Sequence, residues 1–537
     1  MTAIRQPGSE IGGDGRCTLL FHEPRRFHWL LYIALLGVYL LLVAQGFGPF
    51  ISDDHPFRQT QTALTIRSFS EWRDFFYYRI PILGPPWTIP FEFPIYQAIV
   101  RGLEVLSGLR LETCGRLVSV LFFLASWWPI SRLLDVLGVT HKKVVAALLL
   151  LAPVYVFWSR SVMIETTALF FSLVYLAEFA RVYRKDGVNA LDLAVILGFG
   201  TLAALTKVTT FAPLCLVASA AMLLKFVPTV FAGRGYGKWL ALGLVHLAIL
   251  LVTIVWIRHT DALKSLSPLG EMLTSSQLSN WNFGPLEQRL DPRIWFALLN
   301  NSSDMFFPFP RHYMPLKAAL VALLAAIFGY AFSNCGRQRR QQVLVLLGLF
   351  VLPFIIFTNL HRIHNYYQVA NGWLAILALA LALIGAYEAA PDARRRCIIA
   401  AMHLGLLGVF FSCSLWYLHF KNTGAFRYPD LTTAIQRETP ADAVLIITGL
   451  DWSPEVPYYA NRRALMRMEA TKGTATWDRA LTQLRQSGVP VAAYVACGSG
   501  PDPQVTKQFT LADGGETFDG CILYRVAVPY VAQPPQE

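Results

Sequence analysis

The sequence predicts a polytopic α-helical membrane protein with a C-terminal extracytoplasmic α/β domain. Only 15% of the 537 residues are charged and 55% are hydrophobic, whereas a soluble protein carries about 25% charged residues. Apolar runs long enough to cross a bilayer recur between residues 29 and 417. Beyond them, short apolar strands alternate with a helical pattern, which is typical of a small α/β domain.

Apolar runs of about 17–25 residues define about eleven candidate spans. They lie at 29–48, 116–136, 143–158, 163–180, 190–206, 208–224, 239–257, 315–333, 343–358, 369–387 and 397–417. They divide the chain into a cytoplasmic N-terminal tail (1–28), a transmembrane domain (29–417) and an extracytoplasmic domain (418–537). Two long outer loops interrupt the transmembrane domain, at 49–115 and 258–314.

The loops between the spans separate by charge. Basic residues cluster in EPRRFHW, THKK, RVYRKDG, KFVPTVFAGRGYGK, NCGRQRRQQ and PDARRRC. Such loops stay cytoplasmic, so the other loops and the C-terminal domain are expected on the periplasmic side of the cytoplasmic (inner) membrane. The net charge of +12 then follows from membrane topology, and no nucleic-acid partner is expected. The first span lacks a cleavage site after it and is interpreted as an anchor.

The first outer loop opens with the string ISDDHPFRQTQTA. A carboxylate at the membrane boundary is partly desolvated, which can move its pKa toward the working range of a general base. Asp53 and Asp54 are therefore candidate bases, the alternative being a solvated loop start. If the following residues are helical, Arg58 lies on the same side as Asp54. Further along, Glu92 in PFEFPIYQ either lines an acceptor groove or belongs to a loop held on the membrane surface.

Two outer turns between spans carry ionisable residues. Arg160 ends the third span and Glu165 lies in the first turns of the fourth. An ionisable residue in a span needs a partner, and Arg160 is the nearest for Glu165; alternatively, Glu165 is a helix-starting carboxylate favoured by the helix dipole. Lys207 stands between two apolar runs, where it either snorkels to the interface or holds a phosphate as a point charge.

The turn NLHRIHNYYQ gathers hydrogen-bond donors in one short segment: His361, Arg362, His364, Tyr366 and Tyr367. Such donors suit a phosphate or a sugar. Arg311 and His312, in FPFPRHYMP, either add donors at the same face or anchor their loop at the interface. No segment has metal-site spacing, so no cofactor is expected; a divalent metal stays open but is not indicated.

The C-terminal domain contains the apolar strands AVLIIT, VPVAAYVAC and CILYRVAV and the amphipathic helix WDRALTQLRQSG. Cys497 and Cys521 each adjoin a predicted strand, and in an oxidising compartment they can form a disulfide. In GLDWSPEVPYYANRR, Asp451, Trp452 and Tyr458 suit sugar or lipid headgroups. The alternative is that this loop packs the domain.

Together these features resemble the membrane-embedded C-type glycosyltransferases, over residues 29–417. The resemblance is to the branch of the protein O-mannosyltransferases and the lipid A aminoarabinose transferase. It rests on the acidic first outer loop, the Arg…Glu pair at the turn between the third and fourth spans, the lysine between the fifth and sixth spans, and the His-x-x-His-x-Tyr-Tyr turn. Asp54 matches the first carboxylate of that family's Asp-Glu pair, with Asp53 as fallback. His55 stands where the family has glutamate, which leaves the base open between the two aspartates.

The resemblance implies the C-type fold and an inverting transfer of a single sugar. The donor is a polyprenyl-phosphate-linked sugar, and the acceptor is a hydroxyl of an extracytoplasmic glycan, lipid or protein. The residues implied to bind the donor phosphate are Arg58, Lys207, His364, Tyr367 and Arg362. The residues implied to line the pocket or support it are His55, Glu92, Arg160, Glu165, Arg311 and His312. Two alternatives stay open: a transporter or flippase of a lipid-linked saccharide, and an oligosaccharide ligase or polymerase that uses a polyprenyl diphosphate.

Overall fold

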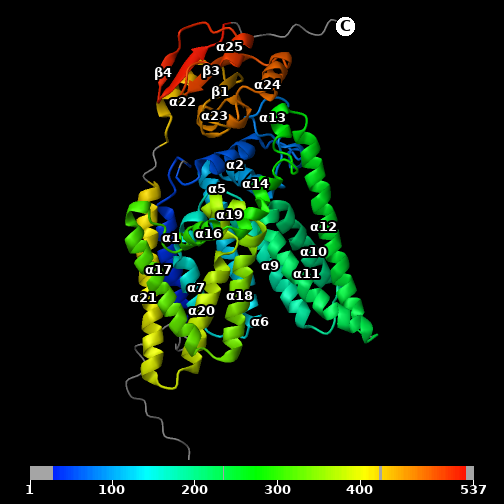
Figure 1. The fold of residues 1–537 in the computed structure, drawn as a ribbon, viewed down its shortest axis with the longest axis vertical. Coiled ribbons are helices and arrows are strands. Elements are labelled where there is room, and N and C mark those ends of the chain that lie inside the picture. The colour runs from blue at the N-terminus through cyan, green and yellow to red at the C-terminus, as the bar shows by residue number, and fades with distance from the viewer. Residues whose placement is uncertain (1–27, 52, 234, 423–425, 528–537) are drawn as a thin grey trace, which may run out of the picture.

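A computed structural model describes residues 28–51, 53–233, 235–422 and 426–527. A bundle of helices carries the small C-terminal α/β domain on one end, called here the domain end (Figure 1). Within the described residues, seven helices are long and apolar enough to cross a membrane, so the predicted class of multi-pass membrane protein is confirmed. Apart from His28, the predicted tail at 1–28 lies outside the described residues.

The first half of the bundle runs from α1 to α12. These helices are α1 (His28–Ala44), α2 (Pro56–Ser68), α3 (Asp74–Tyr77), α4 (Ile95–Ser107), α5 (Leu111–Ala125), α6 (Trp127–Val136), α7 (Lys142–Leu151), α8 (Pro153–Trp158), α9 (Glu165–Arg184), α10 (Ala190–Thr206), α11 (Val208–Phe231) and α12 (Tyr236–Lys264). Helix α2 confirms that the segment after Asp54 is helical.

The second half of the bundle begins with short helices of the second long loop. The elements are α13 (Pro268–Glu271), α14 (Ser279–Phe283), α15 (Leu286–Leu290), α16 (Pro292–Ser303), η2 (Arg311–Tyr313), α17 (Met314–Asn334), α18 (Arg337–Ile356), α19 (Thr358–Ile363), η3 (Asn365–Val369), α20 (Gly372–Ala389) and α21 (Ala393–Asn422). Helix α20 is buried along most of its length, and it forms the centre of the bundle.

The apolar run predicted as one span at 143–158 is divided in the structure into two short helices, α7 and α8. Ala152, between them, has an extended backbone. The cause is Pro153, which has no N–H to continue the helix and disfavours helical geometry in the residue before it. The break leaves α8 as a short buried helix that leads into the turn containing Arg160.

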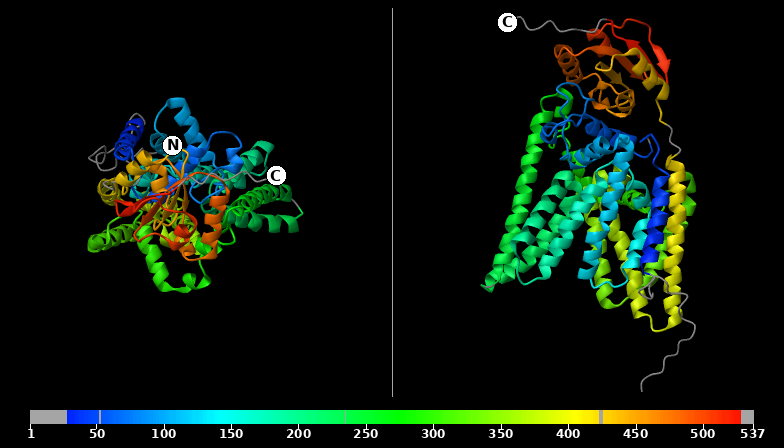
Figure 2. Two further views of the ribbon diagram at one scale, coloured as in Figure 1. Left: turned by 90° about the horizontal axis from the view of Figure 1, so that it is seen from above. Right: turned by 180° about the vertical axis from the view of Figure 1, so that it is seen from behind.

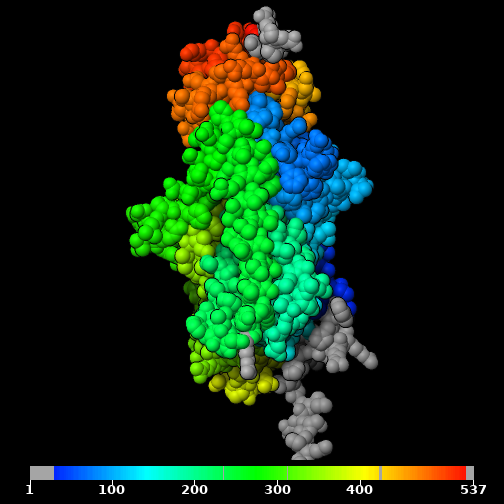
Figure 3. Space-filling model, turned by 90° about the vertical axis from the view of Figure 1, so that its right-hand side faces the viewer, coloured from blue at the N-terminus to red at the C-terminus, as the bar shows by residue number. Residues whose placement is uncertain are grey.

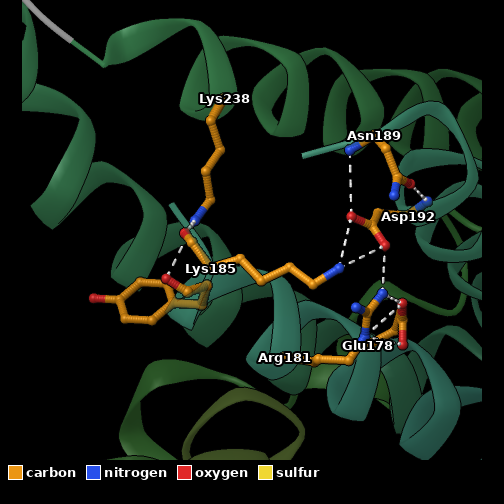
Figure 4. Close-up of polar contacts among 7 residues, drawn as sticks. Glu178, Arg181, Lys185, Asn189, Asp192 and Lys238 are labelled. Carbon is orange, nitrogen blue, oxygen red and sulfur yellow. Dashed lines mark hydrogen bonds and ion pairs between the residues drawn. The ribbon is translucent and has the colours of Figure 1, made fainter. Parts of the chain in front are cut away.

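A cluster of charged residues fixes the turn between α9 and α10 (Figure 4). This turn lies at the end of the bundle away from the C-terminal domain (Figure 1). Arg181 pairs with Glu178 and Asp192, and Lys185 lies 3.2 Å from Asp192. Asp192 also forms a capping box with Asn189. The cluster lies in RVYRKDG, one of the loops predicted to be cytoplasmic, and ties together the two helices that this loop connects.

The C-terminal domain is built on one mixed sheet of five strands in the order β2-β1-β3-β5-β4. The strands are β1 (Val444–Thr448), β2 (Arg463–Met466), β3 (Val491–Cys497), β4 (Glu516–Phe518) and β5 (Cys521–Arg525), and the helices and turn are α22 (Pro429–Glu438), α23 (Glu455–Ala460), η4 (Glu469–Thr471), α24 (Ala475–Gln486) and α25 (Pro503–Gln508). β1 runs parallel to both neighbours, whereas β3, β5 and β4 pair antiparallel. The predicted α/β class of this domain is confirmed.

The first long loop of the membrane domain pairs directly with the edge of this sheet. The amides of Ala464 and Met466 in β2 donate to the carbonyls of Pro81 and Ile82, both at 2.9 Å. These bonds cover an edge strand that would otherwise expose unpaired backbone groups. On the other side, the Gln483 amide donates to the Leu266 carbonyl at 3.0 Å. The domain therefore sits in direct contact with the segments below it, as the surface shows (Figure 3).

Asp451, Trp452 and Tyr458 of the C-terminal domain contact either the membrane domain or another loop of their own domain. The Tyr458 hydroxyl donates to Glu112 at 2.6 Å, and the Trp452 ring meets Phe57 of α2 at a centroid distance of 4.8 Å. Asp451 accepts a hydrogen bond from the Glu469 amide. The contacts of Tyr458 and Trp452 therefore fit the alternative in which the loop GLDWSPEVPYYANRR packs the domain.

The structure joins Cys497 to Cys521 by a disulfide between β3 and β5. The bond closes a loop with a sequence separation of 24, which restricts the unfolded chain and stabilises the domain by about 3 kcal/mol. We expect the double variant Cys497→Ala/Cys521→Ala to lose that much unfolding free energy in its C-terminal domain, measured by proteolysis in denaturant. Reducing agent is expected to destabilise the parent protein equally and to leave the variant unchanged. Equal sensitivity of both proteins would contradict the prediction.

Candidate functional site

The sequence-predicted polar residues gather at the domain end, under the C-terminal domain. They come from the start of α2, the turn between α8 and α9, the α10–α11 junction, and the turn between α19 and η3. Figures 1 and 2 show these segments side by side beneath the sheet. Residues far apart in the chain are thus brought into one polar cluster, called here the site.

Lys207 and Arg58 supply the part of the site called here the cation side. Lys207 and Glu165 form the more buried of its two ion pairs. The Lys207 Nζ lies 2.6 Å from Glu165 Oε1, and the side chains are 5% and 4% exposed. Lys207 lies at the junction where α10 ends and α11 begins, with an extended backbone. Its ammonium lies over the rings of Tyr367 and Tyr366, at 4.2 and 5.2 Å from their centroids. Aromatic faces stabilise a cation in this position, so the ammonium is fixed at the domain end.

Arg58 supplies the second cation, from the first turns of α2. Its guanidinium pairs with Glu92 and donates to Gln61 at 2.7 Å. Burial alone would lower the pKa of Arg58, but the Glu92 carboxylate outweighs it and raises the pKa. The sequence predicts Arg58 on the same side as Asp54, but the structure has no bond between the two side chains. The left-handed backbone of His55 turns the chain before α2 begins.

Asp53 lies between two buried arginines. Its carboxylate is 3.4 Å from Arg160 and 3.5 Å from Arg116, and it accepts a hydrogen bond from Gln59. The side chains of Asp53, Arg116 and Arg160 are 7%, 1% and 0% exposed. The expected pairing of Arg160 with Glu165 is therefore wrong. Arg160 lies in the turn before α9 and faces Asp53 of the first loop, whereas Glu165 begins α9 and faces Lys207 at the α10–α11 junction.

Asp54 has a more open environment than its neighbour, with 16% of its side chain exposed. The Tyr417 hydroxyl donates to it at 3.0 Å, and Lys421 lies 3.2 Å away. Burial would raise the pKa of Asp54, but the charges of Lys421 and His55 and the two hydrogen bonds outweigh it and hold the pKa below its usual range. Asp54 is therefore an ionised carboxylate that still reaches the surface of the site.

The histidines lie between the aspartates and the cations. His55 Nε2 is 3.0 Å from the side-chain oxygen of Asn365, and its ring contacts those of His364 and Tyr366 at 5.3 and 5.0 Å. Burial lowers the pKa of His364 to about 3, helped by the charges around it. Its buried Nδ1 has no hydrogen-bond partner among the described residues. A neutral imidazole with an unused ring nitrogen is thus available to a ligand.

Two predicted residues, Arg362 and His312, stand apart from the cluster. Arg362 is exposed at the end of α19, and its backbone carbonyl accepts from Asn301 at 2.6 Å. The ring of His312 packs on Tyr313 at 4.3 Å. The side chain of Arg311 lies outside the described residues. The structure therefore gives neither Arg362 nor His312 a contact with Lys207 or Arg58.

Four residues of the site were missed in the sequence. Tyr417 and Lys421 hold Asp54, whereas Arg116 and Gln59 hold Asp53. A signal existed for the first pair, because a tyrosine and a lysine four residues apart share one helix face. Arg116 also had one, because an arginine in the first turns of a predicted span needs a partner.

The described residues contain no group of three or more histidine, cysteine, aspartate or glutamate side chains placed to hold a metal ion. The cluster instead combines four carboxylates, each paired with a basic side chain, with neutral donors from other elements. Cations and neutral donors are groups that bind an oxyanion, and a carboxylate such as Asp54 can accept a proton from a hydroxyl.

No protein-family model matches the chain, and no curated protein matches it by sequence. Solved structures match it by fold. ArnT from Cupriavidus metallidurans bound to undecaprenyl phosphate superposes with a TM-score of 0.53, at 13% identity over 95% of this chain and 100% of that one. The oligosaccharyltransferase AglB from Archaeoglobus fulgidus, in complex with an inhibitory peptide and a dolichol-phosphate, gives 0.52, at 12% identity over 88% and 70%. The chain therefore has the C-type glycosyltransferase fold.

Proposed function

We propose that this protein is an inverting glycosyltransferase. It moves a single sugar from a polyprenyl-phosphate donor to a hydroxyl of an extracytoplasmic acceptor. The observation that carries the proposal is the position of Asp54, an ionised and partly exposed carboxylate next to a cluster of fixed cations and neutral donors. Similar folds in ArnT and AglB, whose structures hold undecaprenyl phosphate and dolichol-phosphate, support a lipid-linked donor.

In this mechanism Asp54 removes the proton from the acceptor hydroxyl. The hydroxyl oxygen attacks the anomeric carbon, and the bond from that carbon to the phosphate oxygen breaks with inversion. Polyprenyl phosphate leaves, so no general acid is needed. Lys207, Arg58 and neutral His364 stabilise the negative charge that grows on the departing phosphate.

Asp54 is a better candidate for the base than Asp53. Asp53 is engaged by two guanidinium groups and an amide, and moving it would leave two buried arginines without their carboxylate. Asp54 is held by a hydroxyl and a partly exposed lysine, and both can keep their bonds while a proton arrives. The Asp53 group then acts as a support that positions the chain before α2.

The charge of the cation side favours a monophosphate over a diphosphate. Lys207 is balanced by Glu165, and Arg58 by Glu92, so the four residues together have no net charge. A polyprenyl diphosphate, the donor of a ligase, carries more negative charge than a monophosphate, and these four residues would leave that additional charge unbalanced. A transporter would need no ionised carboxylate beside the phosphate site.

The test is transfer of radiolabelled sugar by the purified protein from a panel of synthetic polyprenyl-phosphate sugars, with cell-envelope fractions as acceptors. The matching polyprenyl-diphosphate sugars run alongside. We expect turnover from a monophosphate donor, with an inverted anomeric configuration in the product. Donor binding without turnover from any donor or acceptor fraction would support the transporter alternative instead.

The pH dependence of the reaction follows from the lowered pKa of Asp54. A base must be deprotonated, so kcat/KM is expected to stay level from about pH 8 to pH 5, without a histidine limb near pH 6–7. The acidic limb lies below the usual aspartate value of 3.8. Removing the charge of Lys421 in Lys421→Met favours the protonated carboxyl and moves the limb to higher pH. A limb near pH 6–7 that does not move would identify a histidine as the base.

A further inference from the structure

A hydrogen bond joins the C-terminal domain to the segment of the first loop that carries the two aspartates. The backbone amide of Ile51 donates to the hydroxyl of Tyr459 at 2.9 Å. Tyr459 lies in α23, on the side of the C-terminal domain that faces α2 and the site (Figure 1). Ile51 is fully buried and comes three residues before Asp54. A group of the C-terminal domain therefore holds the backbone close to the proposed base.

The ring of Tyr459 also holds the residue before Ile51. It contacts the ring of Phe50 at a centroid distance of 5.6 Å and that of Phe426 at 4.1 Å, and Phe50 and Phe426 stack at 6.2 Å. The carbonyl of Tyr459 accepts a hydrogen bond from Gln436 of α22 at 2.8 Å. Tyr459 is thus fixed by its own domain on one side and holds the first loop on the other.

A chain of contacts leads from Phe50 to Asp54. Arg116 donates to the Phe50 carbonyl at 2.7 Å and lies 3.5 Å from the Asp53 carboxylate. The side-chain amide of Gln59 donates to Asp53 and also to the Asp54 carbonyl, the latter at 2.8 Å. These residues belong to one network, so a shift of the backbone at its start is expected to move the carboxylate at its end.

The carboxylate of Asp54 is held from the opposite side by α21. Tyr417 donates to it at 3.0 Å, and Lys421 lies 3.2 Å away. These contacts persist only while the backbone that carries the carboxylate stays in place, because a hydrogen bond weakens steeply when its geometry is lost. A base must also lie within hydrogen-bond reach of the proton that it removes. The backbone position of Asp54 is therefore part of the catalytic geometry.

We infer that Tyr459 is a positioning residue for the base, and that the C-terminal domain sets the place of Asp54 through it. This inference rests on the proposed function and gives the C-terminal domain a part in the same reaction. The Tyr459 hydroxyl does not act on the substrate; it accepts the hydrogen bond of the Ile51 amide, and the ring limits the movement of Phe50. Without the hydroxyl, the base is held less firmly within reach of the acceptor. Turnover is expected to suffer and donor binding is not, since the residues proposed to bind the phosphate come from other elements.

Tyr458→Phe is the matched control. The Tyr458 hydroxyl also joins the C-terminal domain to the membrane domain, because it donates to Glu112 of α5 at 2.6 Å. Tyr458 and Tyr459 are adjacent, and either change to phenylalanine removes one hydroxyl and keeps the ring. If the hydroxyls serve only to dock the domain, the two variants affect turnover alike. If Tyr459 positions the base, only Tyr459→Phe lowers turnover.

The test measures three quantities on the full-length protein in detergent. They are kcat with the best donor of the panel, binding of undecaprenyl phosphate, and hydrogen–deuterium exchange in the peptide that contains Ile51 and Asp54. In Tyr459→Phe we expect kcat to fall about tenfold, with unchanged affinity for undecaprenyl phosphate and faster exchange in that peptide. Tyr458→Phe is expected to keep the parental value of all three.

Parental kcat in Tyr459→Phe would overturn the inference, whether or not the exchange becomes faster. An equal fall of kcat in Tyr458→Phe would overturn it as well, since turnover would then depend on docking of the domain as a whole. A matching loss of affinity for undecaprenyl phosphate would place Tyr459 in donor binding instead. Absence of turnover in the parent protein with every donor is a failure of the proposed function, which the parent alone reveals, and the positioning role would fail with it.

Discussion

Asp54→Asn is expected to abolish turnover while the protein still folds and binds its donor. General bases contribute about 10²–10⁴-fold to rate, and asparagine cannot take the acceptor's proton. The substitution keeps the shape of the side chain, so the Tyr417 hydroxyl can still donate to its oxygen. Sugar transfer from the best donor of the panel measures the loss, and binding of undecaprenyl phosphate measures the retained affinity.

The neighbouring variant Asp53→Asn is the matched control for this prediction. It leaves the buried Arg116 and Arg160 without their carboxylate, and an uncompensated buried charge is strongly destabilising. We expect a lower unfolding temperature, with turnover per folded molecule close to the parent. The opposite pattern, a stable but inactive Asp53→Asn beside an active Asp54→Asn, would assign the base to Asp53.

The class of the molecule was predictable because hydropathy and charge patterns are local. A span needs only a run of apolar residues, and the strands that contain Cys497 and Cys521 are likewise recognisable as short apolar runs. The exception, the span at 143–158, shows the limit of this method, since one proline divides an apolar run without changing its hydropathy.

The partners within the site were less predictable because they depend on packing. Glu165 has its nearest sequence cation five residues away, yet it pairs with Lys207, 42 residues along the chain. Asp54 is held by Tyr417 and Lys421 from the last helix of the bundle. The nearest charged residue in the sequence is the wrong partner when two neighbouring side chains face in different directions, as those of Arg160 and Glu165 do. The residue types and their common end of the bundle could be predicted, but not the pairs.

Lys207→Met is expected to lower both the stability of the protein and its affinity for the donor. Removing the ammonium leaves Glu165 as a buried, unpaired carboxylate, because its side chain is only 4% exposed. Breaking a buried pair in this way costs about 3–5 kcal/mol. In the proposed mechanism the same change also removes a charge-assisted hydrogen bond to the donor phosphate, worth about 1.5–3 kcal/mol, which corresponds to a loss of about 10–150-fold in affinity. Thermal unfolding and undecaprenyl phosphate binding measure the two effects separately.

The double variant Lys207→Met/Glu165→Gln separates a binding role from a structural one. Glutamine removes the unpaired charge at nearly the same volume, so most of the lost stability is expected to return. Binding of undecaprenyl phosphate is expected to stay weak, because the cation that faces the phosphate is still absent. If Lys207 only neutralises Glu165, the double variant will recover affinity together with stability, and the phosphate must then be held by Arg58 and the neutral donors. Weak binding in a stable double variant would instead establish the ammonium as a ligand of the phosphate, since the net charge of the Lys207–Glu165 pair and the stability of the protein are then both unchanged.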